Sequence, residues 1–225
     1  NLLLNLSATG RSNMENNKDQ WAYGDYSTTF EGFQWNSTSG WNGNRLLISD
    51  GSSIEVNLAP FADRSVTASG LTIEMEFSTL NVRNENAVLC DLRNASGKGL
   101  LLTASEATLT SAGDALVTTK YKSGEDIRLS FVVNPATGAT NKGLAFIYIN
   151  GILSGASKFA ENDNFLSDAL LKMGGTIEAA IALKQILVYN RALSDDEILN
   201  NFTLYRDTNA EMMEVYDRSN IMDGR

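Results

Sequence analysis

The chain has 225 residues, a net charge of −9 and an isoelectric point near 4.6, with one cysteine and no histidine. The acidic balance disfavours binding to nucleic acid, because that depends on clustered Lys and Arg. The lack of histidine excludes Ser-His-Asp and Cys-His catalysis and histidine-ligated zinc, so carboxylate and calcium chemistry remain. The apolar runs are too short to span a bilayer, so we expect no membrane insertion.

A chain of this length with 43% hydrophobic residues can bury a substantial core, and all-β sandwiches reach this size as one domain. Cys90 follows two apolar residues, and we expect it to be buried rather than to act as a nucleophile. The lack of an internal disulfide is compatible with synthesis in a reducing compartment. Because the chain starts at Asn1 without Met, we expect a fragment or processed piece whose targeting signals lie elsewhere.

Residues 1–44 are predicted to be a lead-in that packs on the domain after it. Asn1 to Gln20 is polar and rich in Asn, and Trp21 to Trp41 contains all three tryptophans. Aromatic rings stack on the apolar face of a sugar, and amides pair with its hydroxyls. The candidate ligand-binding residues are Trp35, Trp41, Trp21, Tyr23, Tyr26, Asn36 and Asn44. The alternative is that the tryptophans fill the edge of the core, since large aromatic side chains are usually buried; Trp35 and Trp41 are the first choices for exposed rings.

From Arg45 onward, short extended runs alternate with turn signals such as Asp50-Gly51 and Asn134-Pro135. The predicted strands are Arg45–Ser49, Ile54–Leu58, Leu71–Thr79, Ala87–Leu92, Gly99–Thr103, Ala107–Thr110, Ala115–Thr119, Ile127–Asn134, Leu144–Ile149, Ala169–Met173 and Ala180–Asn190. Asn150-Gly151 tolerates positive φ and predicts a hairpin that pairs back through Ile152 to Gly155.

The end of this region predicts a strand followed by a short amphipathic helix. In the last strand, four apolar residues are predicted to share one face, opposite Lys184: Ile181, Leu183, Leu187 and Tyr189. Ser194 lies three residues before Glu197, which is the spacing of a capping box. The apolar residues that follow at helical spacing are Ile198, Leu199, Phe202 and Tyr205. The predicted fold is therefore all-β, a two-sheet antiparallel sandwich with one short C-terminal helix.

Four motifs carry a family resemblance: Gly70 to Phe77, Ile127 to Val133, Tyr148 to Gly151, and Gln185 to Phe202. In this order they resemble laminin-G-like domains of the concanavalin-A-like lectin/glucanase superfamily. The resemblance covers Arg45 to Tyr205 and implies a jelly-roll sandwich over residues 45–205. Residues 206–225 are then a connector that packs on other parts of a longer protein, or a frayed tail.

A second resemblance rests on Gly10 to Asn13, Trp21, Phe33 to Trp41 and Pro60-Phe61. These residues are similar to laminin-G-like modules in structural proteins of tailed phages and prophages. The resemblance implies a virion tail or fibre protein, located in the phage particle or otherwise outside a cell or at its surface. The implied partners are a cell-surface glycan or surface protein and neighbouring virion subunits.

Three functions compete, because this fold hosts lectins, enzymes and protein-binding modules. We predict a non-catalytic recognition and structural module that binds a carbohydrate or a host surface. The first alternative is a scaffold domain that contacts other subunits and has no glycan ligand.

The less favoured alternative is a β-glucan hydrolase. Jelly-roll endoglucanases of the superfamily carry Glu, Asp and Glu on one face of a strand. Glu74 and Glu76 share a face here, but Ser78 occupies the position of the third carboxylate. We interpret Thr72, Glu74 and Glu76 as the solvated side of a half-buried strand and assign no catalytic residue.

Many laminin-G-like and legume-lectin-like domains use calcium, which needs several oxygen ligands from converging loops. The acids at predicted loops or strand ends are Asp50, Asp63, Asp91, Asp114, Asp126 and Asp163. Their spacing matches no calcium-binding motif, so the metal stays unassigned and no cofactor is expected.

Overall fold

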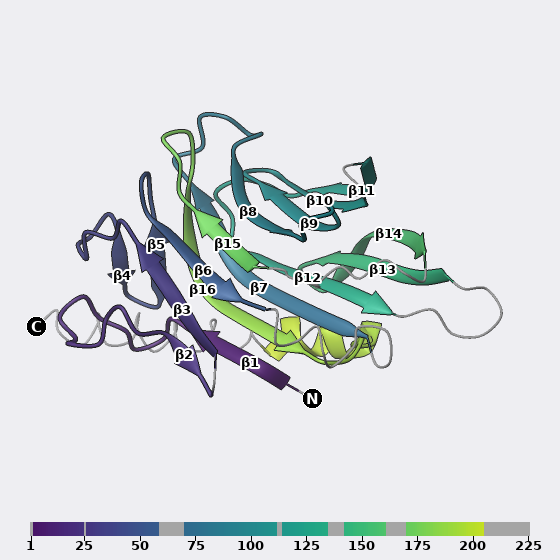
Figure 1. Cartoon of the computed structure of the whole chain (residues 1–225), viewed down its shortest axis with the longest axis horizontal. Coiled ribbons are helices and arrows are strands. Elements are labelled where there is room, and N and C mark those ends of the chain that lie inside the picture. Colours follow the sequence, from purple (N-terminus) through teal and green to yellow (C-terminus); the bar gives the residue numbers. More distant parts are fainter. Residues whose placement is uncertain are drawn as a thin grey trace, which may run out of the picture.

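The computed structural model describes residues 2–24, 26–58, 70–111, 114–134, 142–160 and 170–204. In this part of the chain two antiparallel sheets pack face to face, and one helix lies outside them (Figure 1). The predicted all-β sandwich with a short C-terminal helix is confirmed.

Each sheet draws its strands from both halves of the chain. The first sheet has the order β14 (Ile152–Ala160), β13 (Lys142–Ile149), β12 (Ile127–Asn134), β7 (Leu71–Leu80), β16 (Ala180–Tyr189), β5 (Arg45–Ile48) and β4 (Gly40–Asn42), and β1 (Leu2–Ser7) also pairs with β16. The second has the order β11 (Asp114–Lys120), β10 (Glu106–Ser111), β9 (Gly99–Thr103), β8 (Val88–Arg93), β15 (Leu170–Gly174), β6 (Ser53–Asn57), β3 (Tyr26–Glu31) and β2 (Ala22–Tyr23).

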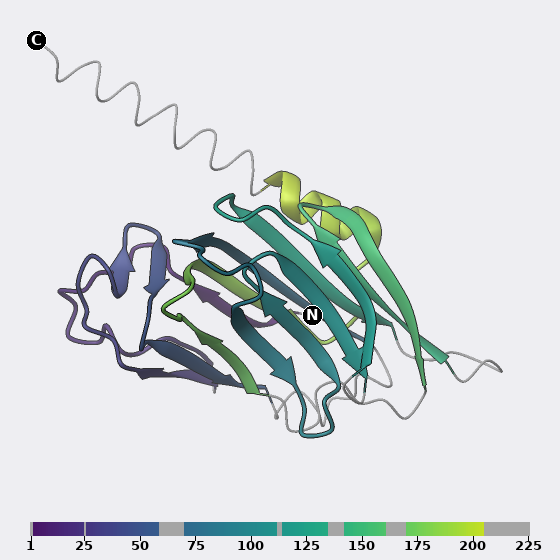
Figure 2. The same cartoon turned by 90° about the horizontal axis from the view of Figure 1, so that it is seen from above.

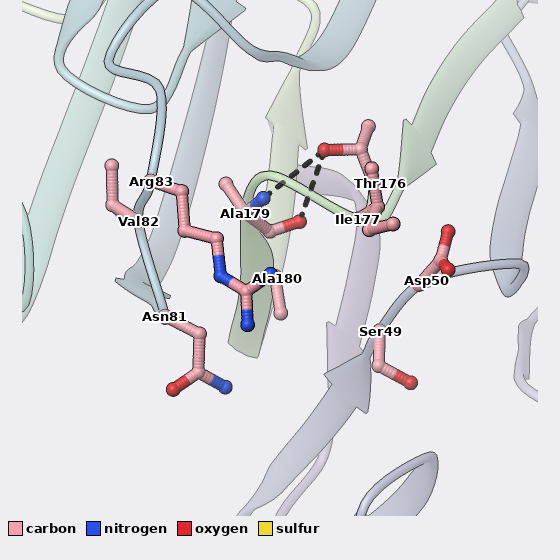
Figure 3. Close-up of a pocket in the computed structure, with 9 residues that line it drawn as sticks. All are labelled: Ser49, Asp50, Asn81, Val82, Arg83, Thr176, Ile177, Ala179 and Ala180. Carbon is pink, nitrogen blue, oxygen red and sulfur yellow. Dashed lines mark hydrogen bonds between the residues drawn. The ribbon is translucent and has the colours of Figure 1, made fainter.

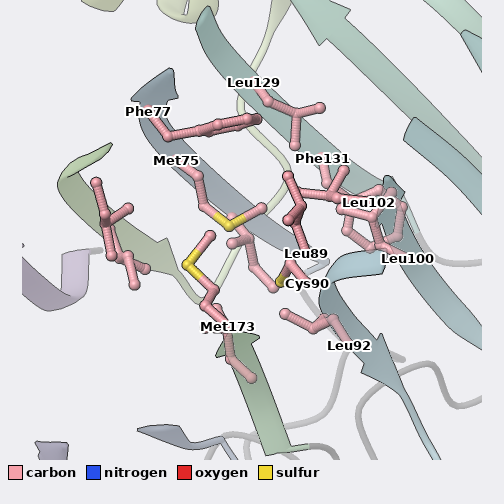
Figure 4. Close-up of a cluster of buried hydrophobic side chains, with 14 of the residues drawn as sticks. Met75, Phe77, Leu89, Cys90, Leu92, Leu100, Leu102, Leu129, Phe131 and Met173 are labelled. Carbon is pink, nitrogen blue, oxygen red and sulfur yellow. The ribbon is translucent and has the colours of Figure 1, made fainter. Parts of the chain in front are cut away.

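Inward-facing apolar side chains of the two sheets fill the space between them. Figure 4 shows part of this core, where Met75 and Phe131 of the first sheet meet Leu102 and Met173 of the second. Cys90 is also there, 1% exposed, as predicted, and burial raises the pKa of its thiol. Period-two alternation places one face of each strand in this core, which explains why strand positions were predictable.

The hairpin between β13 and β14 is confirmed. Asn150 and Gly151 have φ of 53° and 77°, the left-handed conformation that a tight two-residue turn requires. Asn150 also caps the neighbouring strand, because its backbone N–H donates to the Arg128 carbonyl oxygen at 2.8 Å and its Oδ1 accepts from the Arg128 N–H at 2.9 Å.

The helix covers residues 195–204 and begins with the predicted capping box. The Glu197 N–H donates to Ser194 Oγ at 3.3 Å, and the Ser194 N–H donates to Glu197 Oε2 at 2.9 Å. Ile198 is 1% exposed and packs with Val132 and Tyr148 on the outer face of the first sheet. Figure 2 shows the helix, in yellow-green, outside one layer of the sandwich.

β16 differs from its predicted pattern. A β-bulge between Leu183 and Gln185 shifts its register against β7. The residues of β16 in the core are Ile181, Leu183, Ile186 and Val188. Tyr189 instead packs with the cluster beneath the helix. Leu187, two residues earlier in the same strand, lies on the same face and is not part of the core between the sheets. The predicted common face of Leu183, Leu187 and Tyr189 is therefore wrong, because one extra residue reverses the alternation.

Residues 2–44 supply strands to both sheets. β1 pairs with β16, β4 pairs with β5, and β3 pairs with β6. Residues 205–225, which include the predicted connector, lie outside the described residues.

Candidate functional site

Three connections pass from one sheet to the other at the same end of the sandwich. They join β5 to β6, β7 to β8, and β15 to β16. Between them lies a cavity of about 450 Å³, here called the loop-end pocket. It is lined by Ser49, Asp50, Asn81, Val82, Arg83, Thr176, Ile177, Ala179 and Ala180 (Figure 3).

Hydrogen bonds between the three connections hold the loop-end pocket in shape. The Arg83 N–H donates to the Glu178 carbonyl oxygen at 2.7 Å, and Asn84 Nδ2 donates to Glu178 Oε2 at 2.7 Å. The Gly175 N–H donates to the Ser52 carbonyl oxygen at 3.1 Å. A side chain at Gly175 would clash with the Ser49 carbonyl, so the two backbones approach as closely as glycine allows. The pocket is therefore preformed.

Three polar side chains of the loop-end pocket have unused hydrogen-bonding capacity. Among the described residues, Asp50, Asn81 and Arg83 have no side-chain hydrogen bond or ion pair. Figure 3 shows the Arg83 guanidinium pointing into the pocket near Asn81, with Asp50 on the opposite wall. Ile177 is 71% exposed and adds an apolar surface at the rim.

Thr176 has a structural role at this pocket. Its Oγ1 accepts hydrogen bonds from the Glu178 and Ala179 N–H groups, both at 3.1 Å. These bonds fix the turn between β15 and β16 and leave the hydroxyl engaged. The groups that are available to a ligand are thus an acid, an amide and a guanidinium.

Glu74 and Glu76 do not form a solvated face, so that interpretation is wrong. They are 1% and 3% exposed. Glu74 accepts from Arg128 Nη2 at 3.0 Å, Ser130 Oγ at 2.9 Å and Asn201 Nδ2 at 2.9 Å, the last from the helix above. The helix covers this part of the sheet, and sequence alternation alone could not indicate that cover.

Glu76 forms an ion pair with Lys184 at 3.0 Å, and Lys184 also contacts Asp126 at 2.9 Å. A retaining glycosidase needs one carboxyl that is a proton donor and one that can reach the sugar. Here both carboxylates are covered and paired with cations. The geometry of this pair therefore does not fit glycoside hydrolysis.

The tryptophans of the predicted ligand site lie in or against the core. Trp21 and Trp41 are each 3% exposed and pack edge to face at 5.4 Å, and Trp35 is half-buried against them. Trp41 Nε1 donates to the Lys18 carbonyl oxygen at 2.8 Å, and Trp21 Nε1 donates to the Ser7 carbonyl oxygen at 3.0 Å. The alternative, in which tryptophans fill the edge of the core, is therefore correct for Trp21 and Trp41, and the choice of Trp41 as an exposed ring is wrong.

The other predicted ligand residues surround this aromatic cluster. Tyr23 is 41% exposed, and Tyr26 is half-buried against the core. Asn36 Oδ1 accepts from the N–H groups of Thr38 and Ser39 at 2.9 and 3.0 Å, which holds a turn, and Asn44 is exposed. Ligand contact at any of these residues stays a prediction.

The calcium candidates are separate in the structure. Within the described ranges, no group of three or more Asp, Glu, Cys or His residues is placed to hold a metal ion. Asp91 pairs with Arg93 at 2.6 Å, which holds the pKa of its carboxyl below the usual value. Asp126 pairs with Arg45 and Lys184. Asp63 and Asp163 lie outside the described residues.

A second cavity, of about 470 Å³, lies at the start of the helix. Two of its polar groups pair with each other, because Tyr148 Oη donates to Asp195 Oδ1 at 2.5 Å, which leaves Asn134 and Asp196 as its available side chains. Burial, followed by this hydrogen bond, raises the pKa of Tyr148. The cavity therefore offers a ligand fewer available groups than the loop-end pocket does.

Sequence reasoning missed Asn81 and Arg83 and treated Asp50 only as a possible calcium ligand. The available signal in the sequence was weak: an Asn follows a long strand-like run. Asn adopts positive φ more readily than most residues, and Asn81 has a φ of 52° in the structure. Only the topology brings these three loops together.

No family model matches the chain. Its fold is similar to the receptor-binding domain of the botulinum neurotoxin C/D mosaic serotype, with 14% identity and a TM-score of 0.64 over 90% of this chain and 51% of that one. It is also similar to the binding domain of botulinum neurotoxin DC in complex with SialylT, with 15% identity and a TM-score of 0.61 over 90% and 50% of the two chains.

A third similar structure is that of botulinum neurotoxin type C, whose description states that cell entry of this toxin depends on interaction with two ganglioside molecules. It has 14% identity and a TM-score of 0.62, over 90% of this chain and 50% of that one. The chain thus spans about half the length of these toxin domains, and the likeness shows a shared β-sandwich fold. Among the described residues, no helix has the length and apolar character to cross a membrane.

Proposed function

We propose that the chain is a non-catalytic recognition module that binds a cell-surface carbohydrate through the loop-end pocket. The observation that carries this proposal is the convergence of Asp50, Asn81 and Arg83, whose side chains have no partner among the described residues. Sugar hydroxyls donate and accept hydrogen bonds, and buried hydroxyls must be paired. A carboxylate, an amide and a guanidinium satisfy both requirements.

The shape and surface of the loop-end pocket support the same function. Its volume of about 450 Å³ is within the range of small-ligand sites. Val82 and the exposed Ile177 line it beside the polar groups and can contact the apolar face of a sugar ring. The toxin domains with the same fold act in receptor binding, as their descriptions state, but the chain matches only about half of each.

We further propose that the module is part of a phage virion protein, in a tail or fibre, with a host-surface glycan and neighbouring virion subunits as partners. The support is the sequence resemblance at Gly10 to Asn13, Trp21 and Phe33 to Trp41. Mass spectrometry of purified particles from a strain that encodes the chain tests this location. Particles without peptides from the chain would contradict it, in which case a cell-surface location is the remaining proposal.

The test of carbohydrate binding is calorimetric titration of the chain with oligosaccharides from bacterial envelopes. Asn81→Gly removes the amide and keeps a residue that accepts the φ of 52°, so we expect about tenfold weaker binding and an unchanged fold. Tyr23→Ala, in the aromatic segment, is the matched control and should bind normally. If only Tyr23→Ala weakens binding, the ligand lies on the aromatic segment instead.

Failure of the folded chain to bind any envelope oligosaccharide would favour the scaffold alternative, in which the domain contacts other subunits. Release of reducing ends from β-glucans would contradict the non-catalytic proposal. Glu74→Gln separates the two explanations of such activity, because a contaminating enzyme would be unaffected by this substitution.

A further inference from the structure

Arg83 differs from the other described arginines in its pairing. Each of the others forms an ion pair with an acid: Arg11, Arg45, Arg93, Arg128 and Arg191. Arg83 forms none with the described residues, although the chain carries a net charge of −9. The acid on the adjoining turn, Glu178, is bound through its side chain by Asn84 at 2.7 Å. A positive charge therefore remains available at the loop-end pocket, on an exposed side chain.

The backbone of Arg83 is fixed although its side chain is unpaired. Its N–H donates to the Glu178 carbonyl oxygen at 2.7 Å, which ties this position to the turn between β15 and β16. The guanidinium extends from there into the pocket (Figure 3). Guanidinium is always charged, and its planar donors match the two oxygens of a carboxylate or sulfate.

We infer that the sugar bound in the loop-end pocket carries an anionic group, a carboxylate or a sulfate, and that Arg83 binds this group. The inference rests on the proposed carbohydrate-binding function and specifies its ligand class. Asp50, on the opposite wall, repels the anionic group and accepts hydrogen bonds from hydroxyls. The two charges thus fix the orientation of the sugar, with its anion toward Arg83.

The net charge of the chain disfavours an anionic ligand, so attraction of such a ligand must come from a local contact in the loop-end pocket. A net charge of −9 repels a polyanion at long range. At physiological ionic strength the screening length is about 8 Å, so the overall field weakens and contacts inside the pocket dominate. The preference for an acidic sugar should therefore depend on one side chain.

The experiment uses oligouronic acid, the same oligosaccharide after reduction of its carboxyl groups, and a sulfated form of the reduced oligosaccharide. Each is titrated into the whole chain at physiological ionic strength. We expect the two anionic probes to bind up to about fivefold more tightly than the neutral one, since Arg83 is exposed and a solvent-screened ion pair is worth about 0.2–1 kcal/mol. Arg83→Gln should bind the two anionic probes no more tightly than the neutral one, whatever its effect on the affinity for the neutral probe.

Lys158→Gln is the control, because Lys158 is an exposed cation on edge strand β14 and does not line the pocket. It should keep the preference for anionic probes. Equal binding of all three probes by the wild type, or equal losses in both variants, would overturn the inference and leave carbohydrate binding intact. If none of the probes binds to the folded chain, the envelope oligosaccharides of the previous test decide whether the proposed function fails as well.

Discussion

Glu74 and Arg128 form an ion pair at 3.0 Å on the outer face of the first sheet, with side chains 1% and 6% exposed. The helix over residues 195–204 closes over the pair, and Asn201 donates a further hydrogen bond to Glu74 at 2.9 Å. Burial of both charges costs desolvation free energy that the ion pair and these added hydrogen bonds offset. The pair therefore couples the position of the helix to the sheet.

Glu74→Ala should lower the free energy of unfolding by about 3–5 kcal/mol, because it leaves the Arg128 charge buried without its partner. Urea denaturation followed by circular dichroism measures this loss. The double variant Glu74→Leu with Arg128→Met should lose less than the sum of the two single variants, since it removes both charges.

The control for this pair is Glu55→Ala, which breaks an exposed ion pair with Lys172 at 3.0 Å. Solvent screens that pair, and its loss should cost less than about 1 kcal/mol. Similar losses of unfolding free energy for Glu55→Ala and Glu74→Ala would show that burial of the Glu74–Arg128 pair has no energetic consequence.

Glu197 gives the chain a pH-dependent contribution to stability. The Arg191 guanidinium, with help from the Ser194 N–H, lowers the pKa of this carboxyl from 4.5 to about 2. Its folded pKa is depressed, so its contribution is present above pH 4.5 and disappears as the pH falls toward about 2. The difference in Tm between the wild type and Glu197→Gln should therefore be largest above pH 4.5 and should shrink as the pH falls toward about 2.

Ser194→Ala is the matched control for Glu197, because it removes a helix cap without removing a titratable group. It should cost about 1 kcal/mol and change much less with pH than Glu197→Gln does, because the Ser194 side chain contributes least to the lowered pKa of Glu197. A Tm difference for Glu197→Gln that stays constant from pH 7 to pH 2 would contradict the assignment of the stabilisation to its ionised form.

The positions of the strands along the chain after Arg45, and the capped helix, could be predicted because both depend on local patterns. Gly99–Thr103 and Ile127–Asn134 have the predicted bounds, and Ser194 and Glu197 form the predicted box. The face of Tyr189 could not be predicted, because the bulge between Leu183 and Gln185 leaves no recognisable pattern in the sequence. The loop-end pocket was missed for a different reason: its residues meet only through the topology of two sheets.

Trp41→Ala should destabilise the fold by about 3–5 kcal/mol, since it removes a large ring that is 3% exposed. Its Nε1 bond to the Lys18 carbonyl oxygen is lost as well. Tyr23→Ala, at a side chain that is 41% exposed, should lower the Tm far less. Thermal unfolding of the two variants compares them directly, and an unchanged Tm for Trp41→Ala would mean that this ring is not part of the core.

Gly32 and Gly43 both have positive φ, 68° and 61°, but the space around a side chain at the two positions differs. A Cβ at Gly43 would meet no atom within 4 Å, so Gly43→Ala should cost only the strain of the left-handed conformation, about 1–2 kcal/mol. A Cβ at Gly32 would clash with the carbonyl oxygen of Gly51.

Neither backbone at that contact can move as a side chain does, so Gly32→Ala must displace the turn that carries Asp50 into the loop-end pocket. We expect it to be less stable than Gly43→Ala in urea denaturation and to bind the oligosaccharide more weakly in calorimetry. Equal stability of the two variants would show that the turn between β5 and β6 yields without cost. Normal binding by Gly32→Ala would show that the position of Asp50 does not matter for the ligand.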